Sequence, residues 1–149
     1  MGTIHLPPDF KEFLKLLHSK HVEYLLIGGY AVGYYGYARA TADMDIWIAP
    51  RLANADKLVE TVREFGFGVE GLSAELFLKE DNIVRMGVPP FRIELLTAIS
   101  GVTFQECYEA RTTDVLDDVE VNIISLEHLK VNKKASGRLK DLTDLEYLP

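Results

Sequence analysis

Two acidic residues open an apolar stretch in the first third of the chain, where Asp43-Met44-Asp45 precedes three apolar residues. Because side chains alternate between the two faces of a strand, Asp43 and Asp45 would point the same way and Met44 the other way. Their backbones would lie roughly 7 Å apart, so the carboxylates could converge on a hard cation. Such a pair usually offsets its mutual repulsion with a metal, a base or solvent. Mg²⁺ suits it because this ion prefers one or two carboxylates together with substrate phosphates.

A pair of glycines stands ahead of the acids. Gly28 and Gly29 end the apolar run 24–27 and precede a segment, 30–35, with room for a short helix. A strand that ends in Gly-Gly before a helix exposes backbone N–H groups and lets a phosphate approach without a Cβ in the way. A phosphate-binding turn that faces a carboxylate pair is a layout suited to a nucleoside triphosphate.

A third acid would have to reach the same point from a neighbouring strand, and Glu94 is the candidate. It is flanked by Ile93 and Leu95, where a solvent-facing charge is less expected. Two metal ions held roughly 3.5–4 Å apart by such acids would clamp the attacking and leaving oxygens of an in-line displacement.

The elements that must position these residues follow from hydrophobic periodicity and turn signals. Strands are predicted at 24–27, 43–48, 83–88 and 91–96, and in a hairpin, 115–116 with 119–124, that turns at Asp117-Asp118. Helices are predicted to begin at three N-caps, Asp9, Asn54 and Thr103, of which the first and third form capping boxes with Glu12 and Glu106. The second of these helices would end at Gly66 and the third would run through Arg111, and further helical segments are predicted around 126–134 and 139–148. The fold class predicted is α+β, a mixed sheet flanked by helices in one domain, residues 1–149.

Composition and charge exclude several classes of protein. The longest uncharged run, residues 24–38, is too short and too rich in glycine to span a bilayer, so no membrane association is expected. Cys107 is the only cysteine, which rules out an internal disulfide and favours a cytoplasmic location. The net charge of −7 argues against broad, non-specific binding of nucleic acid, although a local basic pocket is compatible with it.

Two familiar nucleotide-binding motifs fail on spacing. A dinucleotide-binding turn needs G-x-G-x-x-G and an acid about 20 residues further on, whereas Gly28, Gly33 and Gly36 are spaced differently and the next acids come too soon. A P-loop needs Lys-Ser or Lys-Thr where this chain has Tyr34-Tyr35.

The order of the parts resembles the signature of the nucleotidyltransferase superfamily, which has the polymerase-β-like fold. An apolar residue, Gly28-Gly29, the spacer 30–42 and then Asp43-Met44-Asp45 follow one another in that order. The resemblance covers roughly residues 14–148.

Two further segments carry the resemblance. "ARATADMDIWI", with Arg39 and Thr41 just ahead of the acids, is similar to small bacterial nucleotidyltransferases, which include toxin-type transferases of abortive-infection and toxin–antitoxin systems. The closing "KKASGRLKDLTDLEYL" is similar to their tail. The resemblance implies that Arg39, Thr41, Lys134 and Arg138 contact the nucleotide or its phosphates.

The resemblance also implies the roles of the remaining site residues. Gly28 and Gly29 would hold the triphosphate through backbone N–H groups, and Asp43 and Asp45 would bind two Mg²⁺ ions, with Mn²⁺ as a substitute. Glu94 would be the third carboxylate, binding the metal beside the acceptor and helping to deprotonate its hydroxyl. Many relatives have aspartate there, so the longer side chain of Glu94 is a departure from the pattern.

The activity implied is transfer of a nucleoside monophosphate from a triphosphate to a hydroxyl, with release of pyrophosphate. The acceptor stays open among tRNA or other RNA, a protein and a small molecule. The alternative is a non-catalytic nucleotide-binding or regulatory module of a two-protein complex, with a cognate antitoxin or another partner protein. The complete set of Asp43, Asp45 and Glu94 argues against that alternative.

Overall fold

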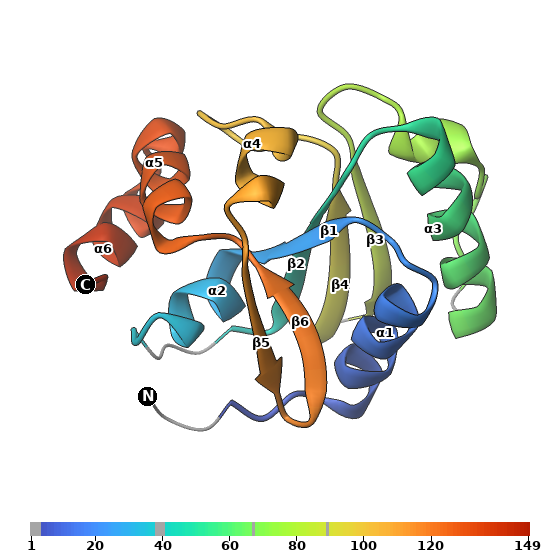
Figure 1. The fold of residues 1–149 in the computed structure, drawn as a ribbon, viewed down its shortest axis with the longest axis horizontal. Helices are drawn as coiled ribbons and strands as arrows, with labels where there is room; N and C mark the ends of the chain where they lie inside the picture. The colour runs from blue at the N-terminus through green and yellow to red at the C-terminus, as the bar shows by residue number, and fades with distance from the viewer. Residues whose placement is uncertain (1–3, 38–40, 67, 89) are drawn as a thin grey trace.

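The chain forms a six-stranded mixed sheet with helices on both faces (Figure 1). The computed structural model describes residues 4–37, 41–66, 68–88 and 90–149. The strands lie in the order β3-β4-β2-β1-β6-β5. Their bounds are β1 Tyr24–Ile27, β2 Asp43–Ile48, β3 Ile83–Val88, β4 Phe91–Leu96, β5 Thr112–Leu116 and β6 Val119–Ile123. The predicted α+β class and mixed sheet are confirmed.

Helices pack on the sheet in two groups. Their bounds are α1 Pro8–Ser19, α2 Gly28–Tyr34, α3 Leu52–Phe65, α4 Phe104–Glu109, α5 Leu126–Ser136 and α6 Leu139–Tyr147, with a 3₁₀ turn, η1, at Ala74–Phe77. Helices α1 and α3 pack together, joined by an edge-to-face contact of Phe13 with Phe65, while α5 and α6 lie at the other end of the molecule (Figure 1). Among the helices of the described residues, none combines the length and apolar character that crossing a membrane requires.

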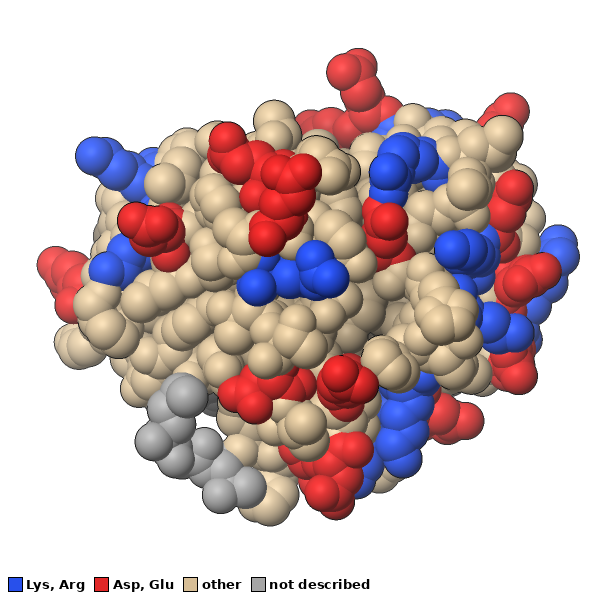
Figure 2. Space-filling model, viewed as in Figure 1, with Lys and Arg blue, Asp and Glu red and all other residues tan. Residues whose placement is uncertain are grey.

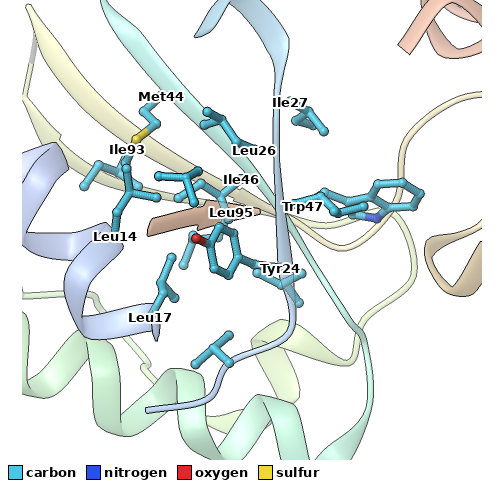
Figure 3. Packing of buried hydrophobic residues seen from close by; sticks show 14 of the residues in the cluster. Leu14, Leu17, Tyr24, Leu26, Ile27, Met44, Ile46, Trp47, Ile93 and Leu95 are labelled. Carbon is cyan, nitrogen blue, oxygen red and sulfur yellow. The ribbon is translucent and has the colours of Figure 1, made fainter. Parts of the chain in front are cut away.

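Alternate residues of the two central strands are fixed in the core. Met44 and Ile46 of β2, and Ile93 and Leu95 of β4, are almost completely buried, in the same cluster as Leu14 of α1 (Figure 3). Burying one such side chain contributes about 1.5–3 kcal/mol. A slip of one residue would therefore move these four side chains out of the core, so the register of β2 and β4 is strongly specified. The residues between them are held on the opposite face.

Asn54 is not the cap that its position in the sequence predicts. Helix α3 already begins at Leu52, and Asn54 is buried inside its first turns. Its Oδ1 accepts a hydrogen bond from the backbone N–H of Glu23, and its Nδ2 donates to the carbonyls of Glu23 and Ala49. The side-chain amide therefore joins the segment before β1 to the segment after β2. Such a long-range role leaves no local signal in the sequence.

The other turn predictions have mixed outcomes. Helix α1 begins at Pro8 after an N-cap at Pro7, so Asp9 lies in its first turn and is not the cap. Thr103 does occupy the N-cap of α4, but its side chain makes no capping bond and the helix ends at Glu109, short of the predicted end. The β5–β6 turn is as predicted: Asp117 and Asp118 have φ of 49° and 66°, the left-handed pair that a type I′ hairpin needs.

A buried ion triad fixes α6 against α5. The Nζ of Lys133 donates to Oδ1 of Asp141 at 3.0 Å and lies 3.1 Å from Oδ2 of Asp144, and all three side chains are at most 5% exposed. Ser136 and Arg138 also donate to Asp141. Burial alone would raise the pKa of Asp141, but the hydrogen bonds from Arg138, Ser136 and Lys133 hold it well below the ordinary value. The stabilisation is therefore present above the unfolded pKa of about 4 and is lost as the pH falls further.

The triad makes a prediction about stability. Asp141→Ala should lower the free energy of unfolding by about 3 kcal/mol at pH 7, because it leaves the charge of Lys133 buried with one partner fewer. Urea unfolding measures this, with Glu146→Ala, an exposed acid on the same helix, as the matched control. Equal stability of the two variants would show that the triad does not hold the helices together.

Candidate active site

The three predicted acids lie on one face of the sheet, where β2 and β4 run parallel. Asp45 pairs with Glu94 across the two strands, and Asp43 pairs with Arg92. Paired strands lie about 4.8 Å apart, so the backbones of Asp45 and Glu94 are direct neighbours. Asp43 is two residues along the same strand and therefore shares their face. The structure thus brings Glu94 beside Asp45 and Asp43, from which it is far apart in the sequence.

Asp45 is the central and most perturbed acid. Burial, together with the neighbouring carboxylates of Glu94 and Asp43, raises its pKa to about 7, and the positive charge of Lys140 opposes this only in part. A raised pKa is what the crowding of these carboxylates predicts. Near neutral pH, Asp45 is thus poised between its protonated and its charged form, and any cation bound there would favour the charged form.

Each outer acid has an arginine of its own. The Nη2 of Arg92 lies 3.1 Å from Oδ2 of Asp43, and the Nε of Arg85 donates to Oε2 of Glu94 at 2.7 Å. Neither arginine was predicted as a site residue from the sequence. Arg85 could have been found from the hairpin, since antiparallel pairing of β3 with β4 places it directly opposite Glu94.

The glycines allow two side chains to approach the backbone closely. Gly28 has φ of +67°, and a Cβ there would lie 2.4 Å from Oδ2 of Asp45. A Cβ on Gly29 would lie 2.7 Å from Oγ1 of Thr41, whose hydroxyl donates to the carbonyl of Asp43. Any larger residue at either position would displace a side chain of the site. Arg39, the other predicted contact in this segment, lies outside the described residues.

Two adjoining cavities meet at Asp45. One, of about 400 Å³, lies over the sheet and is lined by residues that include Thr41, Asp43, Arg85 and Glu94. The other, of about 370 Å³, extends toward α5 and is lined by residues that include Gly28, Asn132, Lys133 and Ser136. Asp45, Arg138 and Lys140 line both cavities. The site therefore has two compartments that share Asp45, Arg138 and Lys140, and both acidic and basic side chains line each of them.

The basic residues at the site are only partly those predicted. Arg138 lines both cavities, as expected of a phosphate contact, but Lys134 is exposed and lines neither. Lys133 is at the cavity instead, because it follows the buried Leu129 by four residues on the same face of α5. Lys140, at the first turn of α6, was missed because no periodicity distinguishes it from a solvated lysine.

The donor set suits Mg²⁺, although it is not a complete cage. Within the described ranges, no three His, Cys, Asp or Glu side chains are grouped so that they could hold a metal ion by themselves. Mg²⁺ does not need such a cage, since it keeps several waters and takes one or two carboxylates with substrate phosphates. Asp43, Asp45 and Glu94 fit this pattern because they share one face.

The surface charge agrees with a local site. Acidic and basic side chains are interspersed over the face shown in Figure 2, and no continuous basic stripe crosses it. Broad electrostatic attraction to nucleic acid needs such a stripe. At the cavities, Lys140 contributes positive charge, whereas Lys133 and Arg138 are paired with Asp141 and Asp144.

Solved structures with the same fold include nucleotidyltransferases. The lincosamide antibiotic adenylyltransferase LnuA, with lincomycin bound, superposes with a TM-score of 0.63 at 14% identity, over 95% of this chain and 94% of that chain. TM1012 from Thermotoga maritima, provisionally described as a nucleotidyltransferase, superposes with a TM-score of 0.63 at 14% identity, over 92% of this chain and 88% of that chain. JHP933 from Helicobacter pylori superposes with a TM-score of 0.53 at 14% identity, over 93% of this chain and 62% of that chain. At such identities these likenesses show the fold alone.

The sequence itself shows the family. No functionally curated protein has significant sequence similarity to the chain. One family profile, however, matches residues 8–148, which is nearly the whole sequence. The match includes the glycine pair, all three acids and the basic residues at the cavities. The protein therefore belongs to the family described as "Nucleotidyl transferase of unknown function (DUF2204)".

Proposed function

We propose that this protein is a metal-dependent nucleotidyltransferase that moves a nucleoside monophosphate from a triphosphate to a hydroxyl acceptor and releases pyrophosphate. The observation that carries the proposal is the pairing of Asp45 with Glu94 across β2 and β4, with Asp43 on the same face. Three carboxylates on one face of the sheet, beside a cavity lined with basic residues, suit a divalent ion and a polyphosphate. The family to which the chain belongs is described as a nucleotidyl transferase family, which supports nucleotidyl transfer in general.

The charged residues of the site would have two binding roles. Asp43, Asp45 and Glu94 would hold Mg²⁺, which, when bound, polarises the phosphoryl group and neutralises charge that develops on it. Arg138 and Lys140, which line both cavities, would bind the phosphates.

The phosphates also need access to the backbone beside Asp45. Helix α2 begins at Gly28, so the main-chain N–H groups of its first turn have no partner within the helix and would bind the phosphates. The space that a Cβ would fill at Gly28 and Gly29 is taken by the side chains of Asp45 and Thr41.

Glu94 is the residue proposed to activate the acceptor. The acceptor oxygen attacks the α-phosphorus, the bond from that phosphorus to the bridging oxygen breaks, and pyrophosphate leaves with the electron pair. The proton of the acceptor hydroxyl passes to the carboxylate of Glu94. Glu94 lines the cavity of about 400 Å³ that lies over the sheet. Its side chain is 15% exposed, so a hydroxyl that enters this cavity can reach it.

A neighbour in fold favours a small acceptor. The cavities, of about 400 and 370 Å³, would be filled at least in part by the triphosphate, so their size does not identify the acceptor. One neighbour in fold, LnuA, is by its description an adenylyltransferase for lincosamide antibiotics. We therefore place small hydroxylated molecules first among the acceptors, ahead of RNA and protein hydroxyls.

Cation binding provides a test that needs no acceptor. Mg²⁺ or Mn²⁺ should raise the melting temperature, because a ligand that binds only the folded state stabilises it. The double change Asp43→Asn and Asp45→Asn should abolish that rise, and differential scanning calorimetry with and without the cation measures it. The apo protein should be as stable as the wild type or more so, since carboxylate repulsion is relieved. A marked loss of apo stability would mean that these acids are structural.

The raised pKa of Asp45 predicts how stability depends on pH in the absence of cations. The folded-state pKa of about 7 lies above the unfolded value of about 4, so the folded state binds more protons between them. In EDTA, the free energy of unfolding should therefore fall by about 2 kcal/mol between pH 5 and pH 8. Asp45→Asn should remove that fall, whereas Asp56→Asn, an exposed acid on α3, should keep it. Identical pH profiles in urea unfolding for the two variants would contradict the assignment.

The reaction is tested by its product and by Glu94. Labelled triphosphates with Mg²⁺ and a cell extract should yield pyrophosphate and a labelled acceptor. Glu94→Gln should then lower kcat by about 10²–10⁴-fold, with little change in the KM for the triphosphate, because a general base acts mainly in the transition state. Release of inorganic phosphate alone would mean attack on the γ-phosphorus. If no product formed with any triphosphate, the non-catalytic alternative would be favoured.

A further inference from the structure

Glu94 is held between two side chains on neighbouring strands. On one side it pairs with Asp45 of β2, and on the other with Arg85 of β3. The Nε of Arg85 donates to Oε2 of Glu94 at 2.7 Å. The side chain of Glu94 is 15% exposed and that of Arg85 is 56% exposed, so the arginine covers the acid from the solvent side.

This contact matters because residue 94 is a glutamate. A glutamate carboxylate has one more rotatable bond than an aspartate carboxylate, and its position is therefore less defined by the backbone. Arg85 binds Oε2 of Glu94, and Glu94 also shares a hydrogen bond with Asp45. A carboxylate offers about four acceptor sites on two oxygens, so a cation that replaced the proton shared with Asp45 would leave the contact with Arg85 in place. A guanidinium, with its fixed planar geometry, restrains the direction of the carboxylate as well as its charge.

We propose that Arg85 is a positioning residue: by binding Oε2, it holds Glu94 so that the other oxygen is available beside Asp45 for a divalent cation. The inference rests on the proposed function, because it concerns how the same acids receive the metal. Arg85 itself would contact neither the metal nor the reacting atoms.

The opposing effect of Arg85 is its positive charge, which repels a cation. Because the Arg85 side chain is largely exposed, dissolved salt screens its charge and weakens this repulsion. Removing the hydrogen-bond partner of a carboxylate that ligates a metal typically weakens binding by about 10–100-fold. The positioning effect of Arg85 on Glu94 should therefore outweigh its repulsion of the cation. The two effects predict opposite changes in cation affinity when Arg85 is replaced.

The test is the affinity of the full-length protein for Mn²⁺ alone, measured by titration calorimetry without nucleotide. Arg85→Ala should weaken binding about 10-fold or more. Arg85→Lys should recover part of that loss, because a lysine can still donate to Glu94. Arg63→Ala, which removes an exposed arginine from α3, is the matched control and should bind as the wild type does.

Melting temperatures without cation separate positioning from a structural role. The melting temperature of the apo protein should change little on Arg85→Ala, since an ion pair with a largely exposed arginine contributes little to stability. A collapse of apo stability would overturn the inference. Arg85→Gln, which keeps a donor without the charge, provides a second variant and should bind Mn²⁺ more tightly than Arg85→Ala does. Unchanged or tighter binding by Arg85→Ala would also overturn the inference and make the arginine a mere counter-ion. Failure of the wild type to bind Mn²⁺ would instead refute the proposed metal dependence.

Discussion

The parallel pairing of β2 with β4 is the constraint on which the site depends. Met44, Ile46, Ile93 and Leu95 must face the core, and this fixes the other faces of both strands. The acids are consequently placed side by side by the free energy of apolar burial, although they repel each other. Burial of Asp45, together with repulsion from Glu94 and Asp43, raises the pKa of Asp45.

The surrounding elements compensate the acidic cluster without neutralising its centre. Arg92 and Arg85 bind the two outer acids, while Asp45 keeps its place between the two cavities. The opposite wall is built by α5 and α6, which the buried triad around Lys133 joins into one unit. Asp43, Asp45 and Glu94 on the sheet thus lie across the cavities from Arg138 and Lys140 at the start of α6, an arrangement that suits a metal-bound polyphosphate.

Sequence reasoning predicted the parts that depend on local patterns. The bounds of β1 to β4 and the left-handed Asp117-Asp118 turn follow from alternation and turn chemistry, and the glycine–acid spacing led to the right family. It failed where contacts cross the fold: Asn54 bridges two loops instead of capping α3, and Lys133 faces the cavity where Lys134 was expected. Such contacts depend on how the elements pack, which the local pattern does not contain.

Anomalous diffraction would test the central claim most directly. Crystals grown with Mn²⁺ and a non-hydrolysable nucleoside triphosphate would show the positions of the metal and the phosphates. The account predicts anomalous density against Asp45, with Asp43 or Glu94 as a second protein ligand and the phosphates on the side of Arg138 and Lys140. A triphosphate bound elsewhere, or one bound at these cavities with no Mn²⁺ on the three acids, would contradict it.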